Sequence, residues 1–196
     1  MMQGFTVKPG QRLYHDFNNT AMGWALPAAI AGSLALDKAP VYCVVGDGSF
    51  MMNLQELATV VAHKLPVRIF LLNNRGYAMV RQTEQQWLGG VHVGTSSDSG
   101  LGFPDFEMLA RSFGIPYIAV AKNSESEGAI RRAIAHDGPV FVEVTVPEHF
   151  GVHPQSKFGY PIEDAEPLLP RAEFMTNMIV EPMPKSLEPL EPTSAI

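Results

Sequence analysis

Residues 44–80 read VVGDGSFMMNLQELATVVAHKLPVRIFLLNNRGYAMV, and two polar motifs in this stretch each follow an apolar run. The first run ends in Gly46-Asp47-Gly48 and the next in Asn73-Asn74, with a segment of helix length between them. The second asparagine stands 27 positions after the aspartate. Polar motifs that follow buried strands in this way are typical of a ligand site divided between two strand ends.

Apolar runs of strand length recur along the chain, and stretches with helical spacing lie between them. The runs cover residues 41–45, 67–72, 117–120 and 140–146, so the order reads β-α-β-α-α-β-α-β. These runs are continuous rather than alternating, which indicates strands buried on both faces. The sequence therefore predicts a doubly wound α/β fold, with a mainly parallel sheet and helices on both faces.

Three segments follow from the distribution of proline and of apolar runs. Residues 1–13 are expected to form a leader, and residues 14–148 a ligand-binding domain that includes a helix in residues 21–36, kinked or begun near Pro27. Nine of the sixteen prolines lie in the last 50 residues. Residues 149–196 are therefore interpreted as a Pro-rich arm, with one short helix near Arg171–Asn177.

Composition excludes several classes of function. The net charge is −6 and Lys and Arg form no cluster, so we expect no nucleic-acid or anionic-membrane partner. The single Cys43 excludes internal disulfides and Cys-rich metal sites, and no apolar run has the length of a membrane span or secretion signal. We therefore expect a cytoplasmic protein. The six histidines show no metal-ligand spacing, and only His92, in a Gly-rich loop, is singled out.

The two motifs of residues 44–80 carry the right atoms for a metal and a phosphate. The backbone N–H groups of Gly48 and Ser49, at the start of the expected helix, favour an anion. Asp47 offers a carboxylate oxygen, Asn74 an amide oxygen and Gly76 a backbone carbonyl. With phosphate oxygens and water these complete the octahedron that Mg²⁺ prefers. The alternative is two ordinary turns, one of them beginning a helix.

The sequence GDGS, followed by NN 27 positions after its aspartate, resembles the thiamine-diphosphate-binding motif. Asp47, Asn74 and Gly76 match the magnesium ligands of that motif. The resemblance is closest to the C-terminal, diphosphate-binding domain of acetohydroxyacid (acetolactate) synthases, and it covers about residues 14–150. It is carried by the stretches AMGWALPAAIAGS, GDGSFMMNLQELATV, LPVRIFLLNNRGYAMVRQ and GPVFVEVTV.

The resemblance implies roles for further residues. Met22 would be the bulky residue that bends the cofactor, with its N–H and the Thr20 carbonyl toward the aminopyrimidine ring. Met79 and Val80 would line an apolar wall beside the thiazolium ring. The alternative for all three side chains is ordinary core packing. The implied cofactor-binding set is Thr20, Ala21, Met22, Gly46, Asp47, Gly48, Ser49, Asn74, Gly76, Tyr77, Ala78 and Met79.

Members of the resembled group usually have three domains, and the first supplies a glutamate that activates the cofactor. No glutamate of this chain takes that role by position, neither Glu56 nor Glu84. The resemblance therefore implies a separately encoded subunit that carries the pyrimidine-binding domain and the activating glutamate. The expected assembly is a heterotetramer that acts on a small 2-oxoacid.

Two positions bear on the reaction. Val80 stands where simple pyruvate decarboxylases have a glutamate that donates a proton, so an apolar residue there favours carboligation over aldehyde release. Thr83 stands where the synthases have tryptophan, which leaves the choice of substrate open. One alternative is a two-subunit decarboxylase of the sulfopyruvate or phosphonopyruvate type, with Arg75 and Arg81 as cationic groups. Another is a non-catalytic, cofactor-binding regulatory subunit; a ferredoxin-linked oxidoreductase subunit would need more cysteines.

Overall fold

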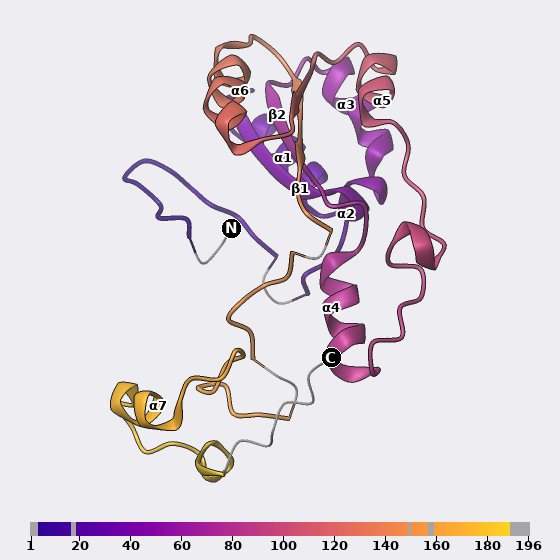
Figure 1. The fold of residues 1–196 in the computed structure, drawn as a ribbon. Coiled ribbons are helices and arrows are strands. Elements are labelled where there is room, and N and C mark those ends of the chain that lie inside the picture. The colour runs from indigo at the N-terminus through magenta and orange to yellow at the C-terminus, as the bar shows by residue number, and fades with distance from the viewer. Residues whose placement is uncertain (1–3, 17–18, 149, 157–158, 189–196) are drawn as a thin grey trace. The chain divides into compact units, whose positions relative to one another are not determined.

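The computed structural model describes residues 4–16, 19–148, 150–156 and 159–188 (Figure 1). The chain divides into two compact units, the first of residues 1–76 and 101–148 and the second of residues 77–100 and 149–196. Residues 1–3 of the expected leader, and residues 149, 157–158 and 189–196 of the expected arm, lie outside the described residues. The domain boundaries expected from the sequence stay a prediction.

The first unit is built on a sheet of four parallel strands in the order β1-β2-β4-β3. All four strands lie where the apolar runs predict them. Their bounds are Val41–Gly46 for β1, Val67–Asn73 for β2, Tyr117–Val120 for β3 and Val140–Thr145 for β4. The predicted parallel sheet is confirmed.

Helices connect these strands in the predicted order. The first unit contains α1 (Ala25–Ala35), α2 (Asp47–Met51), the 3-10 helix η1 (Leu54–Glu56), α3 (Leu57–Ala62), α5 (Phe106–Ser112) and α6 (Asn123–Ala135). The second contains α4 (Ala78–Trp87), η2 (Ser97–Ser99), α7 (Arg171–Asn177) and η3 (Pro184–Leu187). The short helix expected in the C-terminal arm is thus present as α7.

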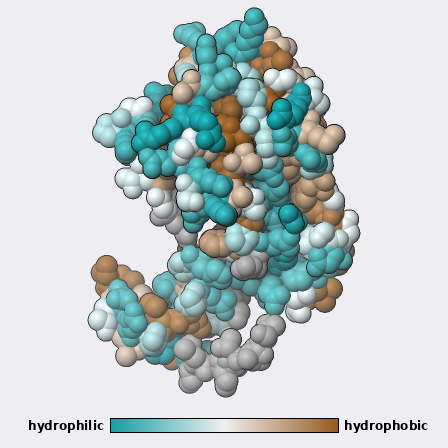
Figure 2. Space-filling model, turned by 45° about the horizontal axis from the view of Figure 1, so that its top comes forward, coloured by the Kyte–Doolittle hydropathy of each residue, from teal (hydrophilic) through white to brown (hydrophobic). Residues whose placement is uncertain are grey.

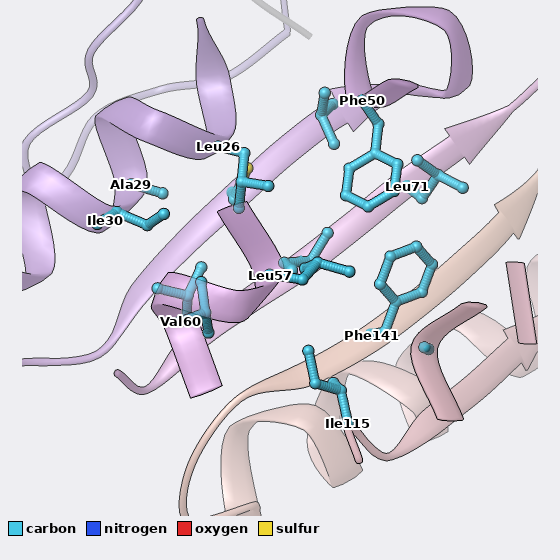
Figure 3. Close-up of a cluster of buried hydrophobic side chains, with 14 of the residues drawn as sticks. Leu26, Ala29, Ile30, Phe50, Leu57, Val60, Leu71, Ile115 and Phe141 are labelled. Carbon is cyan, nitrogen blue, oxygen red and sulfur yellow. The ribbon is translucent and has the colours of Figure 1, made fainter. Parts of the chain in front are cut away.

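Two apolar cores lie on opposite faces of the sheet. Helices α1, α3 and α5 cover one face, where Leu57 of α3 and Leu71 of β2 are fully buried around Phe141 of β4 (Figure 3). Helix α6 covers the other face, where its Ala129 packs with Val142 of β4. Figure 1 shows α6 on one side of the strands and α3 and α5 on the other. Helices on both faces confirm the doubly wound fold and explain why the apolar runs are continuous.

The segment after Asp47 differs from the single helix expected there. It breaks into α2, η1 and α3, and Asn53 at the break has a φ of −139° and a ψ of 29°, outside the helical region. The Asn53 side chain donates to the carbonyl of Gly23, 30 residues earlier, so a tertiary contact overrides helix propensity.

Helix α1 begins at Ala25 and keeps Pro27 in its first turn, where the missing N–H costs no helical hydrogen bond.

The second unit has a polar centre of its own near α7. The Arg171 guanidinium binds both carboxylate oxygens of the buried Asp164, at 2.8 and 2.9 Å. It also donates to the carbonyl of Ser186 and lies over the ring of Phe174, 4.7 Å from its centroid. This two-point ion pair gives the Pro-rich segment a defined fold around one arginine.

The face of the molecule drawn in Figure 2 is mostly polar. On the face drawn in Figure 2, hydrophilic residues cover most of the area and apolar residues lie between them. Within the described part of the chain, no helix is both long enough and apolar enough to cross a membrane.

Candidate functional site

Asp47 occupies the junction between β1 and α2. Gly46 ends the strand with an extended backbone, and Asp47 is the first residue of the short helix. The side chain is 1% exposed, and the N–H groups of Gly48 and Gly76 donate to its two oxygens at 2.7 and 3.1 Å. Burial raises the pKa of Asp47, and these backbone N–H groups oppose the rise. The carboxylate is therefore held in place by the turn that follows β2.

That turn brings Asn74 and Gly76 to Asp47. Arg75 between them has a φ of +57°, a left-handed conformation that reverses the chain. One amide atom of Asn74 lies 3.2 and 3.3 Å from the two Asp47 oxygens and 2.8 Å from the Gly76 carbonyl oxygen. All three neighbours of this atom are hydrogen-bond acceptors. The three groups predicted as metal ligands therefore meet at one point.

The Asn74 amide can present either its nitrogen or its oxygen to this point. With the amide nitrogen at this point, Asn74 would donate to Asp47 and to the Gly76 carbonyl. With the amide oxygen there, carboxylate, amide and carbonyl oxygens converge with the spacing given above. Oxygens bound to one Mg²⁺ at about 2.1 Å in an octahedron stand about 3 Å apart. The donor set thus fits Mg²⁺ in chemistry and in size.

The described residues include no metal site made of His, Cys, Asp or Glu side chains alone. Those residues contain no group of three or more His, Cys, Asp or Glu side chains that could hold a metal ion. The arrangement at Asp47 is of a different kind, because only one of its three donors is a carboxylate. An amide and a main-chain oxygen suit a hard cation that also binds an anionic ligand.

The turn that carries Met22 is joined to α2. The N–H of Gly23 donates to the Ser49 hydroxyl oxygen at 2.9 Å, and the Asn53 amide donates to the Gly23 carbonyl at 2.8 Å. Met22 itself is 42% exposed. Thr20, with a φ of +46°, and Ala21 directly precede this turn. The residue expected to bend the cofactor therefore lies in a turn attached to the segment that follows Asp47.

The hydrogen bond between Gly23 and Asn53 was not predicted from the sequence. The only local signal is the glycine directly after Met22, because a position with φ of +89° favours glycine. Nothing in the sequence pairs that glycine with an asparagine 30 residues later.

The remaining predicted residues belong to the second unit. The N–H of Tyr77 donates to the carbonyl of Thr95 at 2.9 Å, and Ala78 begins α4. Met79 and Val80, in the first turn of α4, are 52% and 42% exposed. Their part in a cofactor site stays a prediction.

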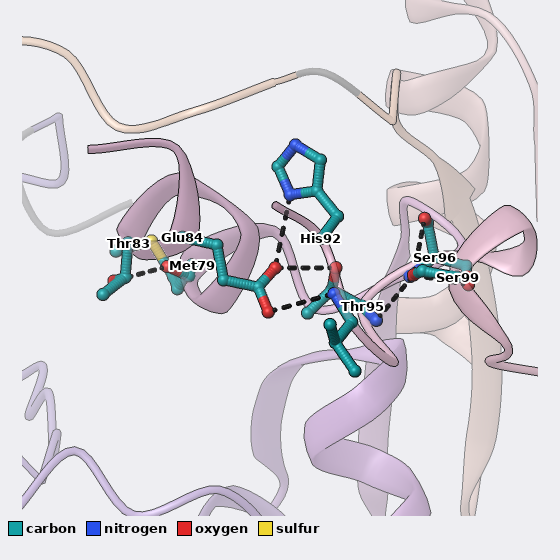
Figure 4. Close-up of polar contacts among 8 residues, drawn as sticks. Met79, Thr83, Glu84, His92, Thr95, Ser96 and Ser99 are labelled. Atoms are coloured by element: carbon teal, nitrogen blue, oxygen red, sulfur yellow. Dashed lines mark hydrogen bonds and ion pairs between the residues drawn. The ribbon is translucent and has the colours of Figure 1, made fainter. Parts of the chain in front are cut away.

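A buried carboxylate holds the loop after α4 (Figure 4). Glu84 accepts hydrogen bonds from the Val93 N–H at 3.2 Å and the Thr95 hydroxyl at 3.0 Å, and the Nδ1 atom of His92 lies 3.2 Å from it. Burial raises the pKa of Glu84, but the hydrogen bonds from Val93, His92 and Thr95 outweigh this and hold the pKa below its usual value. His92, singled out from the sequence, thus has a loop-anchoring contact.

Comparison with known proteins identifies the family to which this fold and candidate site belong. The family model described as "Thiamine pyrophosphate enzyme, C-terminal TPP binding domain" matches residues 1–144. The chain belongs to this family. The predicted resemblance to the C-terminal domain of acetolactate synthases is therefore confirmed, and thiamine diphosphate (thiamine pyrophosphate) is the cofactor of the family.

Acetolactate synthases are prominent among the relatives of this thiamine pyrophosphate-binding domain. The large subunits from Pyropia yezoensis and from Escherichia coli (strain K12, isozyme 2) each match 133 residues, or 68% of the chain, with 39% identity. The chloroplastic acetolactate synthase 1 of Zea mays is 34% identical over 83% of it. The chain spans only 22–26% of the length of these relatives.

A solved enzyme structure shares the fold. The thiamine diphosphate-dependent 4-hydroxybenzoylformate decarboxylase of Rhodococcus jostii RHA1 matches with a TM-score of 0.58 and 31% sequence identity. The match covers 64% of this chain and 23% of the decarboxylase. The thiamine pyrophosphate-binding domain found here is therefore similar to parts of both synthases and decarboxylases.

The Met22 turn yields a test on stability. A Cβ added to Gly23 would lie 2.5 Å from the Asn53 amide nitrogen, and its φ of +89° strains any other residue. We expect Gly23→Ala to lower the free energy of unfolding by about 1–3 kcal/mol, measured by urea denaturation.

Gly32→Ala is the matched control. Gly32 lies inside α1, where a Cβ would make an ordinary contact of 3.9 Å with Val41. This variant should gain about 0.5–1 kcal/mol, because alanine favours a helix interior. Equal effects of the two substitutions would contradict the proposed role of Gly23.

Proposed function

We propose that this chain binds the diphosphate and Mg²⁺ of thiamine diphosphate in an enzyme that decarboxylates a 2-oxoacid and transfers the acyl group, as a carboligase of the acetolactate synthase type. The observation that carries the proposal is the convergence of Asp47, Asn74 and Gly76 at neighbouring strand ends. Family membership supplies the cofactor class.

The residues of the first unit would divide the work. Asp47, Asn74 and Gly76 would hold Mg²⁺ through three oxygens, with Ser49 nearby for the diphosphate. Met22, fixed through Gly23 to Ser49 and Asn53, would support the bend of the cofactor. When bound, thiamine diphosphate supplies the electron sink for decarboxylation.

A partner would complete the site. Glu56 accepts a hydrogen bond from Thr59, and Glu84 anchors its loop, so both carboxylates have structural contacts. The activating glutamate would then come from a separate subunit with the pyrimidine-binding domain, in a cytoplasmic heterotetramer.

A two-subunit 2-oxoacid decarboxylase is the second candidate. The structural similarity to a 4-hydroxybenzoylformate decarboxylase supports it. A sulfonate or phosphonate substrate would need cationic groups, for which Arg75 and Arg81 are candidates. Product analysis with pyruvate and with such substrates would separate the two candidates. A cofactor-binding subunit without catalytic function would bind thiamine diphosphate and give no product with any partner.

Removal of a metal ligand tests the assignment directly. Asp47→Asn and Asn74→Ala should each weaken Mg²⁺-dependent binding of thiamine diphosphate by at least about 100-fold in calorimetry, since substitutions beside the ligands already cost 10–100-fold. Asp37→Asn, at an exposed position with φ of +52°, is the control and should bind like wild type. Wild-type affinity in Asp47→Asn would remove the basis of the proposal.

Dependence on a partner is a separate test. The purified chain should not turn over pyruvate, and activity should appear when a subunit with a pyrimidine-binding domain and its glutamate is added. Full turnover by this chain alone would show that the activating glutamate does not come from a separate subunit.

Val80 tests the fate of the reaction. An apolar residue withholds the proton that aldehyde release requires, so Val80→Glu should shift the products of the reconstituted complex toward aldehyde. Val80→Gln is the control, because an amide of the same size is no acid and should leave the product ratio unchanged. Mainly aldehyde from wild type, with no change in Val80→Glu, would favour the decarboxylase.

A further inference from the structure

A chain of hydrogen bonds runs across the sheet beside the candidate metal turn. The Tyr117 hydroxyl of β3 donates to Glu143 Oε2 at 2.7 Å, and the Asn73 amide of β2 donates to Glu143 Oε1 at 2.6 Å. Glu143 lies on β4, the strand between the other two. A carboxylate accepts hydrogen bonds at both of its oxygens in this way.

The chain continues into the turn. The Asn73 amide oxygen accepts the N–H of Arg75 at 3.0 Å, closing a turn over Asn74. Arg75 has the left-handed φ of +57°, which a residue with a side chain adopts only where its surroundings hold it. The neighbours of Arg75 are the two predicted ligands Asn74 and Gly76.

The direction of the Asn73 amide depends on Glu143. An amide can turn over and exchange its nitrogen and oxygen, whereas an ionised carboxylate can only accept. Glu143 therefore selects the orientation that places the amide oxygen of Asn73 toward the Arg75 N–H. Burial and the adjacent Glu143 carboxylate raise the pKa of Tyr117, so its hydroxyl keeps the proton that it donates.

Strand β4 also supports α2, the helix that contains the predicted ligand Asp47. Phe141 of β4 stacks with Tyr117 at 6.3 Å between ring centroids, and it meets the ring of Phe50 edge-on at 5.4 Å. Phe50 lies in α2, three residues after Asp47. Strand β4 thus contacts both the helix of Asp47 and, through Glu143, the turn of Asn74.

We infer that Glu143, held by Tyr117, is a positioning residue that orients Asn73 and so fixes the turn presenting Asn74 and Gly76 to the metal. The inference rests on the proposed metal site. It assigns to Glu143 no contact with the cofactor or the substrate.

Two measurements on the full chain test it. One is the affinity for Mn²⁺ in the presence of thiamine diphosphate, from the free Mn²⁺ signal in electron paramagnetic resonance. The other is hydrogen exchange of the Arg75 amide, which needs no metal. Glu143→Gln should speed that exchange and weaken Mn²⁺ binding by about 10–100-fold. Glu127→Gln, at an exposed helix pair with Arg131, should change neither.

A double variant separates positioning from general stability. In Glu143→Gln with Asn73→Asp, the new amide can donate to the new carboxylate, which still accepts the Arg75 N–H. This pair should recover both Arg75 protection and Mn²⁺ affinity. Tyr117→Phe keeps the ring stacking and should show a smaller loss in the same direction, which preserves the test if Glu143→Gln folds poorly.

The outcomes distinguish the inference from the proposed function. Wild-type Mn²⁺ affinity and Arg75 exchange in Glu143→Gln would overturn the inference and leave the metal site standing. Failure of the double variant to recover either property would also overturn it. Absence of Mn²⁺ binding in wild type would overturn the metal site and with it the positioning role.

Discussion

One buried carboxylate connects the two halves of the candidate site. Strands β1 and β2 pair in parallel with Gly46 opposite Leu72. The next residue of each segment, Asp47 after Gly46 and Asn73 after Leu72, therefore lies at the same edge of the sheet. The N–H of Gly76 then closes on Asp47 at 3.1 Å. A buried charge without partners costs on the order of 3–5 kcal/mol, so Asp47 requires the turn after β2. The fold and the candidate metal site share this one contact.

Packing behind the site makes the contact rigid. Phe50 follows Asp47 in α2 and lies edge-on to Phe141 in the centre of the larger core. Helix α2 has only five residues, too short to be stable by its own hydrogen bonds. Its position comes from this aromatic contact and from the Gly23, Ser49 and Asn53 hydrogen bonds. The geometry of the candidate site therefore depends on residues beyond the three predicted metal ligands.

The sequence predicted those features that are local. The four strands were predicted from continuous apolar runs, because a strand buried on both faces has apolar residues at successive positions. The spacing between Asp47 and Asn74 predicted their meeting, because parallel neighbours end at the same edge. The break at Asn53 and the bond from Glu143 to Asn73 could not be predicted, since each joins residues 30 to 70 positions apart. The cofactor roles of Met79 and Val80 stay predictions.

The amide of Asn74 offers the most direct test of the metal site. Crystals of the chain grown with thiamine diphosphate and Mn²⁺ would locate the metal by its anomalous scattering. The account predicts one peak within bonding distance of an Asp47 carboxylate oxygen, the Asn74 amide oxygen and the Gly76 carbonyl oxygen. Bound thiamine diphosphate with the peak elsewhere, or with the Asn74 amide nitrogen turned toward Asp47, would contradict it.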